Sequence, residues 1–521
     1  MPRVLAASGR APSRAELRGS LIIVPAAIAC AAIAGFVAGA QPVLILLPVL
    51  LIVPVILWRR LHYAVLFLIA SATVIENFTY TVGTHNGVFT SEIPWWRTFI
   101  HGMILFPVEI FLLLAILIWI MKSALEGSFN LPKSPVMTCL KVFWVLLIVA
   151  VGVGLYHGAQ LKFDLWELRS WIYLTVAFLL AASLLRTMRA LDALLWTFIL
   201  GSGFKGIQGT IVFFSYARRM RPQPEEILGH EEAFLLGVFI IITVALWLYG
   251  IRGRLRTTAT CLLPFVFLAD LANARRTAWL ILAASLATLF AITLKTLPER
   301  RRFLRRALVV VLIGSAVYLP AYWQHDGTLA QPARAVRSQF EPDQRDTSSD
   351  LYRQQEDLNL LLNIKSSSLL GTGFGIPIDY SAQIANISTI DPMIAYIPHN
   401  GLLWVWLRLG LQGEIVFWCL IAAGIIRACQ LAKATDPRLA LLGAVVACSL
   451  VGYVIDGYED MGLAEFRIAV TMGCLLGAME AATRFAQAHA LFPDGEREGT
   501  EAQTELVGLG VSPGPGSVSG H

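Results

Sequence analysis

The stretch YIPHNGLLWVWLRLGLQGEIVFW (residues 396–418) places His399 and Asn400 directly in front of a long apolar run. Such a run, folded as a helix, can cross the hydrocarbon layer of a membrane, which is roughly 30 Å thick. Titratable side chains are costly in lipid and often mark functional positions when they occur at this depth. The stretch therefore predicts a transmembrane helix whose first residues lie at a membrane surface.

The composition extends this interpretation to the whole chain. Of the 521 residues, 56% are hydrophobic and 15% are charged, whereas soluble domains carry about 25% charged residues. We therefore expect an all-α polytopic membrane protein, and the composition excludes a soluble globular one. The seven cysteines form neither a disulfide framework nor a zinc-binding pattern. The sequence predicts no metal and no cofactor.

Apolar runs of membrane-spanning length predict 12 to 14 transmembrane helices. Closely spaced runs such as 258–273 and 277–296 are separate helices in one interpretation and a single element in the other. The candidate spans are 20–40, 42–58, 62–79, 99–121, 137–156, 169–185, 191–215, 233–250, 258–273, 277–296, 304–323, 399–426, 438–455 and 462–484.

These spans divide the chain into five parts. Residues 1–19 form an N-terminal tail, 20–323 a helical bundle, 324–398 a large loop, 399–484 the last helices, and 485–521 a disordered tail. Lysine and arginine prefer cytoplasmic loops, and their distribution predicts cytoplasmic N- and C-termini. The loop at 324–398 then faces outward.

Two segments of this loop have distinct patterns. SSDLYRQQEDLNLLLNIKSS (348–367) is amphipathic, with Asp350 as the expected N-cap of a helix. LLGTGFGIP (369–377) contains three glycines and predicts a tight backbone path, because glycine adopts conformations that other residues avoid.

Several arginines break the charge rule by facing outward. Each alone could contact lipid headgroups, but together they predict an anion site. Arginine pairs its planar guanidinium with phosphate oxygens and stays charged at any working pH. A diphosphate held without a divalent cation fits such a site. The outward-facing arginines are Arg169, Arg218, Arg219, Arg221, Arg275, Arg276 and Arg353.

His399 has two interpretations. An isolated histidine is commonly a hydrogen-bonded structural residue, but a neutral imidazole at an arginine-rich surface could also act as a general base. Charges inside the apolar runs form a separate group that should face a cavity or a partner. This group contains Lys205, Arg408 and Arg467, with Asp456 or Glu459 as a possible partner of Arg467, while Glu231 and Glu232 suit the N-terminus of a helix.

GTGFG (371–375) followed by HNGLLWVWLRLGLQG (399–413) resembles the signature region of the O-antigen ligase and O-antigen polymerase superfamily. The segment ARRTAW (274–279) is similar to the start of that family's arginine-bearing helix. Where many members have serine before this arginine, the chain has Ala274 and Arg275, so Arg275 and Arg276 are equivalent candidates. At Arg408 many relatives carry an acidic residue.

The resemblance implies a GT-C-like, inverting, metal-independent membrane glycosyltransferase of the bacterial inner membrane. Its donor would be a glycan on undecaprenyl diphosphate, its acceptor a glycan, a lipid or a protein, and no nucleic acid is expected. His399 would be the catalytic base and Asn400 would contact substrate. The implied diphosphate-binding residues are Arg275 or Arg276, Arg219 or Arg221, and Arg353.

Two other functions remain open. A transporter of lipid-linked glycan or of another polyanion fits the many helices and buried charges, although transporters of this kind typically have repeated halves and broken helices. A structural or signalling membrane protein would leave the outward-facing arginines without a shared role. Transfer of a glycan, as opposed to its movement, separates the enzyme from the transporter.

Overall fold

The computed structural model describes residues 53–75, 106–127, 131–220, 227–382 and 392–492. Within these ranges the regular elements are helices, and the only strand-like feature is an isolated bridge between Ser368 and Gly371. Eleven helices are long and apolar enough to cross a membrane. This confirms the predicted all-α polytopic membrane fold.

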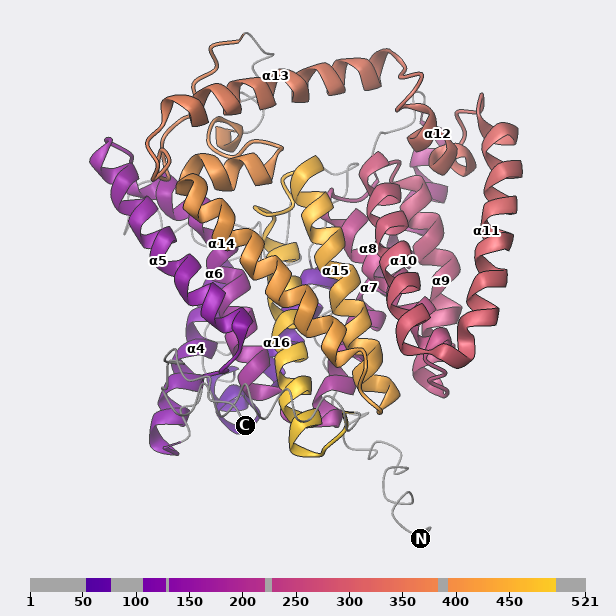
Figure 1. The fold of residues 1–521 in the computed structure, drawn as a ribbon, viewed down its shortest axis with the longest axis horizontal. Helices are drawn as coiled ribbons and strands as arrows, with labels where there is room; N and C mark the ends of the chain where they lie inside the picture. Colours follow the sequence, from indigo (N-terminus) through magenta and orange to yellow (C-terminus); the bar gives the residue numbers. More distant parts are fainter. Residues whose placement is uncertain (1–52, 76–105, 128–130, 221–226, 383–391, 493–521) are drawn as a thin grey trace, which may run out of the picture.

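The membrane-spanning candidates are α4 to α11 and α14 to α16, and they form an upright bundle (Figure 1). The elements are α3 (Tyr63–Ala70), η1 (Ser71–Ile75), α4 (Pro107–Leu125), α5 (Pro135–Tyr156), α6 (Leu161–Leu184), α7 (Met188–Ser215), η3 (Ala217–Arg219), α8 (Glu231–Leu248), α9 (Arg254–Ala272), α10 (Arg276–Thr296), η4 (Pro298–Arg300), α11 (Arg301–Tyr322), η5 (Thr328–Ala330), α12 (Gln331–Arg337), α13 (Gln344–Ser366), η6 (Pro392–Ala395), α14 (Gly401–Leu431), α15 (Pro437–Glu459) and α16 (Phe466–Ala488).

Eleven of the fourteen predicted spans correspond to these long helices. The predicted span 62–79 corresponds to a shorter apolar helix, Tyr63–Val74. The span 20–40 and residues 42–52 of the span 42–58 lie outside the described residues. α9 and α10 are separate helices, because the chain turns between them at Ala274, which has a positive φ of 51°.

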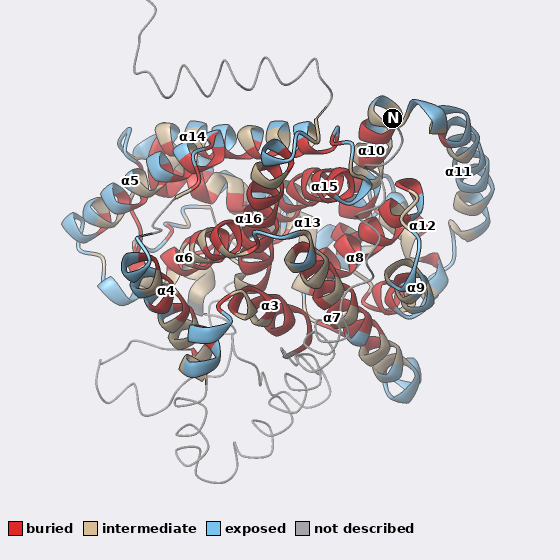
Figure 2. Ribbon diagram, turned by 90° about the horizontal axis from the view of Figure 1, so that it is seen from below, coloured by how far each residue is buried: buried red, intermediate tan, exposed pale blue. Residues whose placement is uncertain are grey.

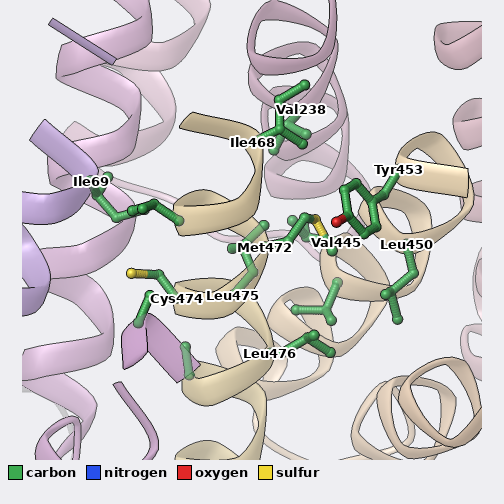
Figure 3. Close-up of a cluster of buried hydrophobic side chains, with 14 of the residues drawn as sticks. Ile69, Val238, Val445, Leu450, Tyr453, Ile468, Met472, Cys474, Leu475 and Leu476 are labelled. Atoms are coloured by element: carbon green, nitrogen blue, oxygen red, sulfur yellow. The ribbon is translucent and has the colours of Figure 1, made fainter. Parts of the chain in front are cut away.

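The centre of the bundle is α16, whose most apolar stretch is 94% buried, against 6% for the peripheral α11 (Figure 2). α16 packs tightly on α6, since a methyl group at Gly473 or Gly477 would overlap the α6 backbone at Leu174 or Phe178. Close approach through small residues is typical of membrane helices. Apolar side chains of α3, α8, α15 and α16 fill this centre (Figure 3).

The helix predicted at 399–426 is not one continuous span. α14 is interrupted at Gly410, which has a φ of 69° and a ψ of −175°. A short first part, residues 401–409, and a long second part, residues 411–431, are therefore joined by a kink. The break frees carbonyl groups that a continuous helix would bond internally. The Leu407 carbonyl accepts from the Thr372 N–H at 2.8 Å, and the Arg408 carbonyl accepts from the Gly373 N–H at 3.2 Å.

The segment GTGFG (371–375) therefore lies in the break of α14, and its three glycines all have positive φ, between 69° and 78°. A methyl group at Gly371 would lie 2.6 Å from the backbone nitrogen of Gly410, and one at Gly373 would overlap α5 at Gly154. The tight backbone path predicted from the glycines is confirmed.

Gly154 and Gly152 on α5 provide a matched test of this contact. A methyl group at Gly154 would overlap the carbonyl oxygen of Phe374, whereas one at Gly152 has no atom within 4 Å. We expect Gly154→Ala to lower the melting temperature of the purified protein clearly. Gly152→Ala should leave it unchanged or raise stability by roughly 0.5–1 kcal/mol, because alanine favours helix more than glycine.

Thermal unfolding of both variants in one detergent, followed by size-exclusion chromatography after heating, measures the difference. Equal melting temperatures would show that the 371–375 segment does not need its contact with α5.

Candidate functional site

His399 lies immediately before α14 and is held by Glu356 of α13. Its Nδ1 is 3.1 Å from Oε2 of Glu356 and 3.3 Å from Oε1, and its backbone N–H donates to Oε2 at 3.0 Å. The Glu356 side chain is 1% exposed and that of His399 is 21% exposed. The carboxylate is thus closed to solvent, while the imidazole remains accessible.

This contact determines which ring nitrogen is available for chemistry. An ionised carboxylate only accepts hydrogen bonds, so Nδ1 of His399 carries the proton and Nε2 presents a lone pair. None of the described residues bonds to Nε2. The ring of Tyr352 packs edge-on against the imidazole, with centroids 5.6 Å apart. In the neutral form of the ring, this arrangement leaves Nε2 as the proton acceptor.

Tyr352 also contributes a hydroxyl group that is buried without a hydrogen-bond partner. Burial raises the pKa of Tyr352, and the neighbouring Glu356 raises it further. The hydroxyl therefore stays protonated at neutral pH. It is a spare hydrogen-bond donor beside His399.

Asn400 is the N-cap of α14. Its side-chain oxygen accepts from the Leu403 N–H at 3.1 Å, and its amide nitrogen donates to Oδ1 of Asp357 at 3.1 Å. The carbonyl of His399 accepts from the Met461 N–H at 2.8 Å, in the connection between α15 and α16. Both polar ends of Asn400 are thus engaged within the protein, and they fix the backbone of His399.

One face of α13 contacts the rest of the site. The helix lies across the end of the bundle at which α14 begins (Figure 1). Its contact residues are three or four positions apart and so share a face. Asp346 and Asp350 meet Arg276, Arg353 meets Glu459, and Glu356 meets His399.

Arg276 is the first residue of α10, and its side chain contacts two carboxylates of α13. One terminal nitrogen is 2.8 Å from Oδ1 of Asp350, and Nε is 3.7 Å from Oδ1 of Asp346. Arg353 donates to Oε2 of Glu459 at 3.2 Å. Glu356 follows Asp350 by six positions, about 9 Å along the helix. α13 therefore contacts both Arg276 and His399.

Arg275 belongs to a second group of contacts at the same end of the bundle. It lies against Nε2 of His230 and 3.9 Å from Oδ2 of Asp460, while Nδ1 of His230 is 3.0 Å from Oδ2 of Asp460. Burial works to raise the pKa of Asp460, but the hydrogen bond from His230 and the charges of Arg275 and Arg353 outweigh it and hold the pKa below its usual range. Asp460 is therefore ionised at neutral pH.

Three predicted anion-site residues that the structure describes, Arg169, Arg218 and Arg219, lie apart from these contacts. Arg218 and Arg219 are exposed in η3 at the end of α7, and Arg221 lies outside the described residues. Arg169 is not outward-facing: α6 begins at Leu161, which places Arg169 two turns into the helix, where it is 4% exposed. It pairs with Glu109 at 2.9 Å and covers the rings of Phe106 and Trp166.

The buried charges predicted inside the spans are structural ion pairs. Arg467 pairs with Glu231 at 2.8 Å and Glu232 at 2.7 Å, so the predicted partners Asp456 and Glu459 are wrong. Lys205 lies 3.9 Å from the same Glu232. The carboxylates that begin α8 thereby neutralise cations of α7 and α16.

Arg408 and Glu167 form the most buried of these pairs, with Nε 2.7 Å from Oε1 and side-chain exposures of 1% and 0%. Glu167 also accepts from the Gly375 N–H at 2.5 Å and from the Trp404 indole at 2.8 Å. Arg408 donates to the Tyr396 carbonyl at 2.8 Å. The pair joins α6, the 371–375 segment and the short first part of α14.

Glu356 was not among the residues that the sequence singled out. The amphipathic pattern of 348–367 directs attention to its leucines, but Leu351, Leu358, Leu361 and Leu362 are exposed, and Glu356 is buried on the opposite face. The predicted N-cap is also wrong, because α13 begins at Gln344 with Asp343 as its cap. The available signal was the spacing of Tyr352, Arg353 and Glu356, which puts all three on one face.

No group of three or more His, Cys, Asp or Glu side chains in the described part of the chain is arranged to hold a metal ion.

Comparison with known proteins gives one match. A family model described as O-antigen ligase matches residues 259–418, and no curated protein matches the chain. The matched segment runs from α9 into α14. It contains Arg275, Arg276, Arg353, Glu356 and His399.

The role of Arg408 can be tested by removing the charge with and without its partner. Arg408→Met leaves Glu167 as an uncompensated buried carboxylate, which costs roughly 3–5 kcal/mol. We expect a large fall in the melting temperature. The double variant Arg408→Met/Glu167→Gln should recover most of the loss, because glutamine retains an acceptor for Trp404 without a charge. A double variant as unstable as the single one would mean that the guanidinium contacts, rather than charge compensation, hold the structure.

Proposed function

We propose, because residues 259–418 match a family model described as O-antigen ligase, that the chain is a membrane glycosyltransferase that takes its glycan from a lipid diphosphate carrier. The observation that supports this best is the alignment along α13 of an accessible imidazole nitrogen with arginines that are able to bind a diphosphate. The donor that the family resemblance implies is a glycan on undecaprenyl diphosphate, at the outer face of the bacterial inner membrane.

The reaction is an in-line displacement with inversion at the anomeric carbon. A hydroxyl oxygen of the acceptor forms the new bond to this carbon while the bond to the diphosphate oxygen breaks. Nε2 of His399 takes the hydroxyl proton, and the leaving diphosphate takes the electron pair. General base catalysis of this kind contributes typically 10²–10⁴-fold. The neutral imidazole fixed by Glu356 fits that role.

Arg276 is the principal candidate for the diphosphate. It is paired with Asp350 and Asp346 of α13, which neutralise the charge of its guanidinium group. A bound diphosphate would take the place of these carboxylates at Arg276. Phosphate oxygens match the paired geometry of arginine. Arg353 pairs with Glu459 and Arg275 lies near Asp460, and both would add positive charge where the leaving group becomes more negative.

Asn400 and Tyr352 take different roles around His399. Asn400 caps α14 and positions the histidine backbone, which supports a positioning role in place of the direct substrate contact expected from the sequence. The unpartnered hydroxyl of Tyr352 is available to a hydroxyl or ring oxygen of a sugar. The acceptor class is a glycan, a lipid or a protein hydroxyl.

His399→Ala should abolish glycan transfer while leaving folding intact, because the imidazole is partly exposed and its loss removes the proton acceptor. His325→Ala is the control, since His325 is an exposed histidine that follows α11, and its ring packs on Tyr322. The measurement is product formation by purified protein from a lipid-diphosphate-linked glycan. Near-normal transfer by the His399 variant would exclude the histidine as the base.

Arg276→Ala should raise the donor KM and lower kcat, because the guanidinium binds the diphosphate before and during bond cleavage. Lys365→Ala is the control: Lys365 is an exposed cation at the other end of α13. Steady-state kinetics with donor and acceptor varied separately measure both constants. An equal effect of the two substitutions on donor KM would show that Arg276 does not bind the diphosphate directly and contributes only its positive charge.

The same assay separates enzyme from transporter. Purified protein in vesicles is given lipid-linked glycan and acceptor on the same side of the membrane. A covalent acceptor product supports the glycosyltransferase, and appearance of unmodified lipid-linked glycan in the opposite leaflet without product would contradict it.

A further inference from the structure

We infer that Glu356 is a positioning residue of the reaction: it holds His399 as the Nδ1–H tautomer and places a negative charge beside the imidazolium that forms during transfer. The inference rests on the proposed role of His399 as the base. Nothing in the sequence pattern or in the family match assigns a role to Glu356.

Glu356 bonds to both the backbone and the ring of His399. Its Oε2 accepts both the backbone N–H of His399, at 3.0 Å, and the Nδ1–H of the ring, at 3.1 Å. The first bond fixes where the histidine lies, and the second fixes how its ring is turned and which nitrogen is protonated. A histidine partner that orients the ring in this way directs the other nitrogen toward the reacting group.

The buried position of the carboxylate makes its charge effective. When Nε2 takes the acceptor proton, the ring becomes a cation directly beside Glu356, which is completely buried. A carboxylate in contact with an imidazolium stabilises that cation as it forms. The ion pair forms only during the reaction, so the stabilisation applies to the transition state and not to the resting enzyme.

The other charged groups near His399 have partners of their own, although Asp357 also interacts with His399 electrostatically. On α13, Asp357 accepts from Asn400 and Arg353 pairs with Glu459, while Tyr352 is neutral. On the connection between α15 and α16, Asp460 faces Arg275 and His230. Glu356 is the carboxylate in direct contact with the imidazole in the described part of the chain. Its removal should therefore dominate the change in the electrostatics of His399.

A purely structural role would have a different signature. If Glu356 only capped the His399 backbone, its substitution would lower stability and activity but would not change the pH at which His399 loses its proton. The pH dependence is therefore the decisive readout.

The test compares Glu356→Gln and Glu356→Asp with the wild-type protein. Glutamine keeps an acceptor for the backbone N–H but has no charge, so we expect kcat to fall roughly 10²-fold. The acidic limb of kcat/KM should move to lower pH by about one unit, because the imidazolium loses its counter-charge. The donor KM should remain near the wild-type value. Aspartate retains the charge and should restore the limb at least partly.

Asp326→Asn is the control, because Asp326 is an exposed carboxylate that pairs with Arg337 away from His399. It should change neither kcat nor the pH profile. A second readout does not depend on activity: the pH dependence of diethylpyrocarbonate modification of the His399 peptide, measured by mass spectrometry, reports the deprotonation of the ring directly.

The outcomes separate the two proposals. A modification profile that shifts to lower pH in Glu356→Gln, but not in Asp326→Asn, supports the coupling of Glu356 to His399 whether or not the chosen donor is accepted. An unshifted profile together with wild-type kcat overturns the inference and leaves the glycosyltransferase proposal intact. Absence of transfer by the wild-type protein with a shifted modification profile counts against the proposed function alone.

Discussion

The buried ion pair between Glu167 and Arg408 is the interaction on which the placement of the site depends. It joins α6 to the short first part of α14, and through the Gly375 N–H it also holds the 371–375 segment. That segment occupies the break at Gly410 and satisfies the carbonyls that the break exposes. Because unsatisfied backbone groups are costly at membrane depth, the break and the glycine segment stabilise each other. Together they fix the short helix that His399 and Asn400 begin.

α13 then connects this fixed histidine to the arginines. Its buried face is mostly polar, with Asp346, Glu356 and Asn359 beside the single buried Leu360, while four other leucines are exposed. A single rigid helix holds Asp350 against Arg276 and Glu356 against His399. Replacement of Asp350 by a diphosphate at Arg276 would alter a contact of the same helix that orients the base. In the proposed reaction, donor binding and the geometry of proton transfer would therefore be linked through α13.

The sequence predicted the features that depend on local pattern. Apolar length identified the spanning helices, and the glycines of 371–375 indicated a tight path whose reason became visible only with Gly410. Pairings between distant segments could not be predicted: Arg467 meets Glu231 across 236 residues, and Glu356 meets His399 across 43. Arg169 was misplaced because α6 begins at Leu161, in a region where Lys162, Asp164 and Glu167 lower the apolar signal. Periodicity shows which residues share a face, but it does not show whether that face meets lipid, protein or substrate.

The paired state of the arginines also bears on how the site would discriminate between lipid carriers. Isolated buried charges are expensive, whereas guanidinium groups already paired with carboxylates carry little of that cost. A ligand must therefore replace those carboxylates with interactions at least as good. Arg276 faces two carboxylates, and Arg275 follows it in the chain beside a third. A diphosphate has enough oxygens and charge to replace several of these contacts, while a monophosphate replaces fewer. The same exchange that admits the donor would therefore disfavour carrier lipids that bear a single phosphate.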